Sequence, residues 1–167
     1  MDVFEAVRTV LAVRDYQDKP VPTGVVQKIV EAGRLTASAN NRQPWHFIVV
    51  TNRGLLQQLG QLAKTGPYIA RASAAIVVCV ENTPLALSDA SRAIQSMILT
   101  AWSEGVASNW VGFHGLDAIK PVLGIPDTLD ILAIVPLGYA VQTVGLGKKK
   151  RKPAAEVISS ERYGKPF

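Results

Sequence analysis

The chain has 167 residues, of which 18 are Lys or Arg and 13 are Asp or Glu, so its formal net charge is +5. Five of the basic residues are consecutive, at positions 148–152, and the remaining charges balance. Charge confined to one segment argues against a broadly basic nucleic-acid-binding surface. An apolar content of 48% argues against intrinsic disorder. The length fits a single domain spanning residues 1–167.

The sequence indicates a reducing compartment and no membrane partner. Cys79 is the one cysteine, so it cannot form an internal disulfide, and its apolar surroundings at 74–80 predict a buried structural role. Asp2 and Glu5 interrupt any apolar leader, so no signal peptide is evident. The longest apolar stretch, 131–141, is too short to span a bilayer as a helix. We expect a cytoplasmic protein.

Hydrophobic periodicity predicts alternating helices and strands along the chain. An amphipathic helix is expected over 3–11, and a second begins with Thr23 as its N-cap and ends near 33–35. A polar loop over 36–44 precedes a strand at 46–50 and a helix at 54–63. A strand at 74–80 is apolar throughout, which predicts burial on both faces. A long helix capped by Ser88 or Asp89 follows.

The last third of the chain continues the mixture. Residues 108–111 are expected to be extended, 116–123 to form a short helix broken by Pro121, and 130–137 to form another buried strand. There are too few strand–helix–strand units for a doubly wound fold. The sequence therefore predicts an α+β sandwich.

Several catalytic classes find no support in the sequence. His46, His114 and Cys79 do not show metal-ligand spacing. There is no Gly-x-Ser-x-Gly elbow, no Walker loop and no Gly-x-Gly-x-x-Gly fingerprint, which argues against a serine hydrolase and against common nucleotide-binding motifs. The glycines at 145 and 147 precede lysines rather than a helix, so they form no dinucleotide cradle.

The polar loop before the first strand is more informative. It supplies Ser38, Asn41 and Gln43, whose donors and acceptors suit a flat heterocycle such as a flavin pyrimidine ring. Trp45 offers a large apolar surface beside them. An ordinary turn with a core tryptophan explains the same residues.

Three further features have two readings each. Gly112 lets the backbone approach a ligand closely, or marks a strand end. The basic run can donate charge-assisted hydrogen bonds to a phosphate, or it is a solvated charge run. Arg14 either lies near a bound anion or is a surface arginine at a helix C-terminus.

Taken together, these pieces resemble the nitroreductase family of FMN-dependent oxidoreductases, in its short form. The most specific match is the loop, where Ser38, Asn41, Gln43, Pro44 and Trp45 fit the pattern Ser-x-x-Asn-x-Gln-Pro-Trp-x-Phe. The other matching segments, in the family's order, are 4–8, 13–16, 19–21, 109–113, 136–139 and 150–158.

The resemblance implies a nitroreductase-like sandwich, with a central, mostly antiparallel sheet flanked by helices. It implies a homodimer with FMN at the subunit interface, and the basic C-terminal segment 140–167 wrapping the partner. It assigns the flavin ring and ribityl chain to the loop, a ring-facing N–H to the backbone near Gly112, and the FMN phosphate to the basic run. The implied cofactor-binding residues are Arg14, Ser38, Ala39, Asn41, Gln43, Gly112, Lys149 and Arg151.

The implied activity is reduction of nitro compounds, quinones or similar small acceptors with NAD(P)H. Hydride would pass through flavin N5 in ping-pong turnover, and no catalytic side chain is required. A nucleic-acid contact through the basic run is the weakest reading, because such runs are non-specific signals.

One departure from the family pattern concerns the phosphate. The family has an Arg and a Ser at the positions of Val10 and Ala12. Their loss leaves three outcomes: the C-terminal basic run compensates, Arg8 is redirected, or flavin binds weakly. The last favours an alternative function, a flavin-binding protein with little turnover that serves storage, sensing or assembly.

Overall fold

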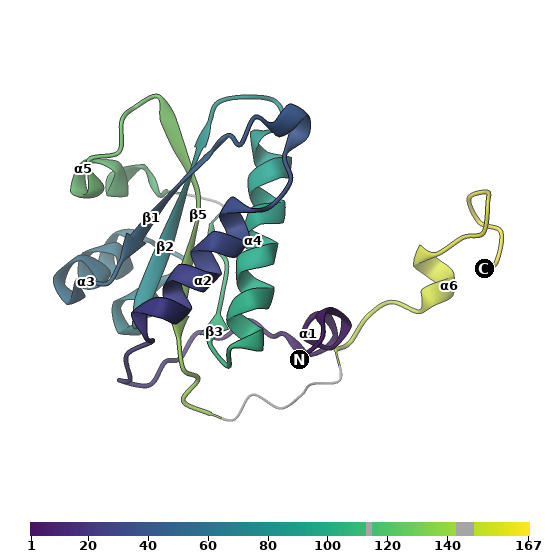
Figure 1. The fold of residues 1–167 in the computed structure, drawn as a ribbon, viewed down its shortest axis with the longest axis horizontal. Helices are drawn as coiled ribbons and strands as arrows, with labels where there is room; N and C mark the ends of the chain where they lie inside the picture. The colour runs from purple at the N-terminus through teal and green to yellow at the C-terminus, as the bar shows by residue number, and fades with distance from the viewer. Residues whose placement is uncertain (113–114, 143–148) are drawn as a thin grey trace.

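A computed structural model describes residues 1–112, 115–142 and 149–167 (Figure 1). Short 3-10 turns, η1 (Ala39–Asn41), η2 (Pro67–Arg71) and η3 (Asp117–Ile119), lie between the main elements. The helices are α1 (Val3–Thr9), α2 (Thr23–Arg34), α3 (Arg53–Leu62), α4 (Ala86–Ser103), α5 (Lys120–Leu123) and α6 (Ala154–Val157). The strands are β1 (Trp45–Val50), β2 (Ala74–Glu81), β3 (Ala107–Ser108), β4 (Val111–Gly112) and β5 (Leu129–Gly138).

The strands form one sheet in the order β1-β2-β5-β3, and β4 also pairs with β5. Each of these described pairs is antiparallel, with β1 running against β2 and β2 against β5. The central strand β2 therefore has neighbours on both edges. Its residues 74–80 are buried, as the apolar run predicted. This confirms the α+β class and the antiparallel sheet.

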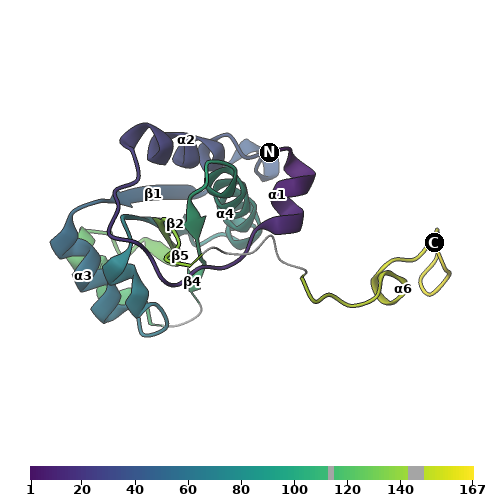
Figure 2. The same cartoon turned by 90° about the horizontal axis from the view of Figure 1, so that it is seen from below.

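Helices cover both faces of the sheet (Figures 1 and 2). Ile76 and Val78 of β2 pack in the cluster that includes residues of α2 and α4, whereas Val77 and Cys79 pack in the cluster that includes residues of α3. Side chains alternate across a strand, so a fully apolar strand serves two cores. Burial raises the pKa of the Cys79 thiol to about 11, which keeps it protonated and chemically inert.

Two predicted helix starts are wrong. Pro22 occupies the N-cap position of α2, so Thr23 is the first helical residue and makes no side-chain cap. Helix α4 begins at Ala86, which places Ser88 and Asp89 inside its first turns rather than at its cap. Asp89 instead bonds a backbone N–H of another segment, a tertiary contact that local patterns do not encode.

The two ends of the chain leave apolar surface exposed. Helix α1 forms where its periodicity predicted, but it ends at Thr9 rather than near residue 11, and Val3 and Phe4 are 76% and 75% exposed. The C-terminal segment 149–167 extends away from the sheet and helices (Figures 1 and 2), and its Tyr163 and Phe167 are fully or almost fully exposed. A single chain therefore does not cover these side chains.

Candidate functional site

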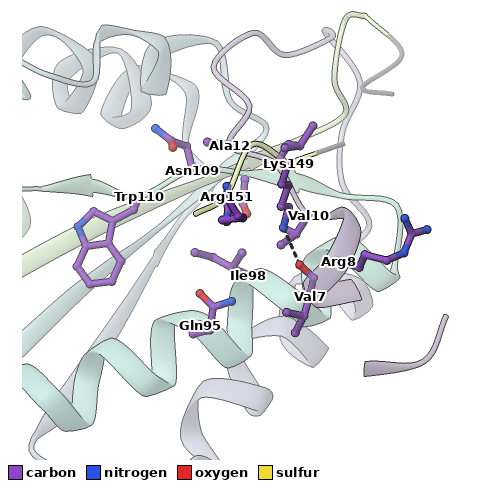
Figure 3. A pocket seen from close by; sticks show the side chains of 12 residues that line it. Val7, Arg8, Val10, Ala12, Gln95, Ile98, Asn109, Trp110, Lys149 and Arg151 are labelled. Atoms are coloured by element: carbon purple, nitrogen blue, oxygen red, sulfur yellow. Dashed lines mark hydrogen bonds between the residues drawn. The ribbon is translucent and has the colours of Figure 1, made fainter. Parts of the chain in front are cut away.

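A cavity of about 810 Å³ opens between the end of α1, the middle of α4 and the start of the C-terminal segment (Figure 3). Polar and apolar residues from four parts of the chain meet there, within 7–12, 95–98, 108–110 and 149–151. The lining residues are Val7, Arg8, Val10, Leu11, Ala12, Gln95, Ile98, Ser108, Asn109, Trp110, Lys149 and Arg151.

One wall is the extended segment after α1. The Val10 N–H closes the helix on the Ala6 carbonyl, and the Val13 N–H then donates to the Ser108 carbonyl at 2.9 Å. These bonds carry 10–12 past the cavity alongside β3. Because the side chains there are Val, Leu and Ala, this wall offers a ligand no side-chain donor.

Two basic residues near the C-terminal end of the sequence also line the cavity. Lys149 and Arg151 both line the cavity, whereas Lys148 lies outside the described residues. The Lys149 ammonium donates to the Val7 carbonyl at 2.6 Å. Desolvation and the neighbouring Arg151 charge lower the pKa of Lys149. An anion in the cavity would relieve the repulsion between these two cations.

Arg8 is a third cation at this cavity, and it was absent from the residues predicted to bind the cofactor. Its guanidinium is paired with the Glu5 carboxylate at 2.7 Å and 2.9 Å and points away from Arg151 in Figure 3. That pair raises the pKa of Arg8 and lowers the pKa of Glu5. The (i, i+3) spacing of Glu5 and Arg8 is that of an ordinary helix ion pair. In this structure the Arg8 guanidinium therefore pairs with Glu5, although Arg8 lines the cavity.

Trp110 separates this cavity from a second one of about 540 Å³, and its side chain lines both. Its indole lies against Gly112, where a Cβ atom would come within 2.5 Å of Trp110 Nε1. Among the described residues the Trp110 N–H has no hydrogen-bond partner. The close approach predicted for Gly112 is therefore made by Trp110 in this structure. Next to it, the buried Asn109 amide donates to the Tyr68 hydroxyl.

The predicted flavin loop lies elsewhere. Ala39 and Asn41 belong to η1, and Ser38 and Gln43 flank it, near the N-terminal end of α4. By contrast, α1 packs near the C-terminal end of that helix (Figure 1). None of the four lines the cavity within the same chain.

Arg14 is likewise outside the cavity lining. Arg14 is exposed. Burial raises the pKa of the nearby Tyr16 hydroxyl, and the positive charge of Arg14 offsets part of that increase. The structure thus brings together Lys149, Arg151 and the neighbourhood of Gly112. The loop and Arg14 remain apart from them in one chain.

Other kinds of site find no support in the described part of the chain. No group of three or more His, Cys, Asp or Glu side chains is arranged to hold a metal ion there. None of the helices in the described ranges has both the length and the apolar character needed to cross a bilayer.

Comparison with known proteins shows the family. The model of the nitroreductase family matches residues 8–86 and 80–139. A protein of Methanothermobacter thermautotrophicus is 35% identical over 154 residues, covering 87% of this chain and 81% of its own length. It carries the name "Putative NADH dehydrogenase/NAD(P)H nitroreductase".

Solved structures agree with the sequence match. A protein of the same name from Parabacteroides distasonis superposes with a TM-score of 0.86 at 27% identity, covering 96% of this chain and 98% of its own. An FMN-dependent nitroreductase from Clostridium difficile has the same fold at 22% identity, with a TM-score of 0.86 and coverage of 96% and 99%. The chain belongs to the nitroreductase family and is an oxidoreductase.

Proposed function

We propose that the protein is an FMN-dependent oxidoreductase that uses NAD(P)H to reduce a small acceptor, such as a nitro compound or a quinone. One observation carries the proposal. Lys149 and Arg151 reach the same cavity as Asn109 and Trp110, and both segments belong to the parts of the sequence that resemble the family's flavin site.

The residues present fit FMN by size and by chemistry. A cavity of about 810 Å³ falls within the range of roughly 300–1,000 Å³ that is usual for cofactor pockets. Ile98 and Trp110 supply apolar surface for a planar ring, and the two cations supply donors for a phosphate. In this proposal the side-chain donors for a phosphate come from Lys149 and Arg151, because residues 10–12 on the wall after α1 carry no polar side chain.

In this proposal the protein binds and orients rather than transferring protons. Lys149 and Arg151 hold the phosphate, and the segment of Asn109 and Trp110, next to Gly112, lies beside the ring. Arg14 does not line this cavity within its own chain, so this site gives it no role. When bound, FMN supplies the redox chemistry, accepting hydride from NAD(P)H and returning it to the acceptor in two half-reactions. No side chain is needed as a general acid or base for hydride delivery.

We further propose that the working unit is a homodimer. The loop that carries Ser38, Asn41 and Gln43 does not reach its own chain's cavity, so a second copy must supply it if both take part in one site. The exposed apolar side chains of α1 and of residues 149–167 suit burial against that copy. The cytoplasmic location stays a prediction from the sequence.

The visible spectrum of the purified protein tests this proposal. The protein should be yellow, or become yellow when FMN is added and the excess removed, and NADH or NADPH should bleach it without oxygen. A protein that stays colourless after FMN treatment would contradict flavin dependence. Flavin that neither nicotinamide reduces would contradict the activity.

The apolar wall at 10–12 favours one alternative, a flavin-binding protein with little turnover. This alternative predicts bound flavin that NADH and NADPH reduce slowly or not at all. Rapid bleaching, followed by reoxidation when a quinone is added, would rule it out. The rate at which the visible spectrum bleaches after NADH or NADPH is added therefore separates the two functions.

A further inference from the structure

The loop around η1 holds an unusual backbone conformation. Asn40, Asn41 and Gln43 have φ angles of 51°, 54° and 51°, in the left-handed region that glycine favours. Asparagine tolerates this region, but each such residue is less stable there than in an ordinary helix or strand. Three in four positions need support from the surrounding structure.

Much of the support is internal to the loop. The Gln43 N–H donates to the Ser38 hydroxyl at 2.9 Å, and the Asn41 N–H donates to the Ser38 carbonyl at 3.0 Å. The Gln43 amide donates to the Asn41 side-chain oxygen at 3.2 Å. These bonds fix the three polar side chains relative to one another, but they do not fix the loop relative to the rest of the protein.

Asp89 on α4 links the middle of the loop to the scaffold. The ends of the loop are tied separately, by the Thr36 hydroxyl to Ser96 Oγ at 2.8 Å and by the Glu81 N–H to the Pro44 carbonyl at 3.1 Å. Its carboxylate oxygens accept the Ala39 N–H at 3.2 Å and 3.1 Å, and the residue is only 1% exposed. Arg92, one turn along the helix, pairs with the same carboxylate. Burying a carboxylate is costly unless it is paired and hydrogen-bonded, and a hydrogen bond to a charged acceptor is stronger than one to a neutral group.

We propose that Asp89 is a positioning residue for flavin recognition. Through Ala39 it holds the loop so that Ser38, Asn41 and Gln43 present their polar groups to the flavin ring and ribityl chain. The inference rests on the proposed function. Under this proposal two groups of residues recognise the cofactor. The loop binds the ring and ribityl chain, which riboflavin and FMN share, whereas Lys149 and Arg151 bind the phosphate, which FMN carries and riboflavin lacks.

Three variants test the role of Asp89. Asp89→Ala removes the acceptor, and Asp89→Asn keeps an oxygen acceptor but removes the charge. Asn52→Ala is the matched control, because Asn52 also accepts a backbone N–H, that of Leu55, at the start of α3 away from the loop. For each full-length protein the dissociation constants of riboflavin and FMN are measured, together with hydrogen exchange over residues 36–45.

Asp89→Ala is expected to weaken riboflavin and FMN by the same factor, about tenfold or more, which corresponds to about 1.4 kcal/mol. Exchange over 36–45 should quicken in parallel, and Asp89→Asn should lie between this variant and the wild type. Asn52→Ala should change neither measurement. Should Asp89→Ala fail to fold, the flavin affinities of Asp89→Asn still test the proposal, because this variant keeps the shape of the side chain.

Two results would overturn the role alone. Flavin affinities that Asp89→Ala and Asp89→Asn leave unchanged would do so, even if loop exchange quickens, because the anchor would then serve only the fold. A loss confined to FMN would do so as well, because it would place Asp89 with the phosphate-binding residues. A wild-type protein that binds neither flavin would overturn the proposed function itself, and is thereby distinguished from both.

Discussion

At the scale of single residues, Lys149 and Arg151 line the cavity and are the side chains that we propose hold the phosphate of FMN. Lys149 is half-buried and Arg151 is exposed, so the lower end of the range for charged hydrogen bonds applies, about 1.5 kcal/mol for each. That loss is roughly tenfold in affinity per residue. Lys149→Ala with Arg151→Ala should therefore weaken FMN about a hundredfold and riboflavin little, as measured by titration of the two flavins.

Lys150→Ala is the matched control for this prediction. It removes the same charge from the same run, but Lys150 does not line the cavity, so FMN affinity should stay near the wild-type value. If the double variant weakened both flavins equally, the two residues would not read the phosphate. If Lys150→Ala had the same effect as Lys149→Ala, general attraction by the run would explain binding instead.

The residue scale also shows where sequence reasoning stops. The basic run was identified as a possible anion site, and the structure brings two of its members to a cavity. The sequence leaves open whether Arg8 is redirected to the phosphate, and in the structure its guanidinium is paired with Glu5. The role of Asp89 depends on Ala39, fifty positions away in the chain, and no local pattern encodes such a contact.

At the scale of elements, strand β4 shapes the wall between the two cavities. A Cβ atom on Gly112 would come within 2.5 Å of Trp110 Nε1 and 3.1 Å of the Leu132 carbonyl oxygen. The carbonyl belongs to β5 and cannot withdraw, so the indole must move. Gly112→Ala should lower the free energy of unfolding by about 1–3 kcal/mol, the usual range for overpacking, and shift the Trp110 fluorescence.

Chemical denaturation and tryptophan emission measure both effects of Gly112→Ala. Gly105→Ala is a useful comparison, because a Cβ there meets nothing within 4 Å although its φ is positive. It should cost stability through the backbone alone and leave the emission of Trp110 unchanged. If Gly112→Ala left the Trp110 fluorescence unchanged, the position of the Trp110 indole would not depend on the absence of a side chain at Gly112.

Helices and strands were predicted well where a single pattern of apolar residues, either continuous or at helical spacing, extends over several residues. The buried strand at 74–80 and the helix over 54–63 correspond closely to β2 and α3. Helix starts are not encoded as clearly, because several polar residues can serve as caps and the choice depends on packing. This is why α4 begins before Ser88 and why Pro22, rather than Thr23, precedes α2.

At the scale of the whole molecule, the exposed face of α1 is the feature that a single chain does not explain. Phe4 is 75% exposed beside Val3, and in a two-fold dimer each contact occurs twice. Burial of a phenylalanine side chain contributes about 1.5–3 kcal/mol. Phe4→Asp should therefore raise the dimer dissociation constant by at least about a hundredfold, as measured by sedimentation.

Phe4→Leu keeps this face apolar and should leave the protein dimeric, which separates loss of apolar contact from loss of the side chain itself. Since the loop of one chain and the cavity of the other form the proposed site, Phe4→Asp should also lose flavin as it dissociates. A wild-type chain that sediments as a monomer with bound flavin would contradict the shared site.

Titration of the purified wild-type protein with FMN, followed by its visible spectrum before and after anaerobic NAD(P)H, tests the central claim most directly. Flavin dependence predicts that FMN is retained after removal of the excess and that its colour bleaches on adding NADH or NADPH. A colourless protein after FMN treatment, or bound flavin that neither nicotinamide reduces, would contradict it.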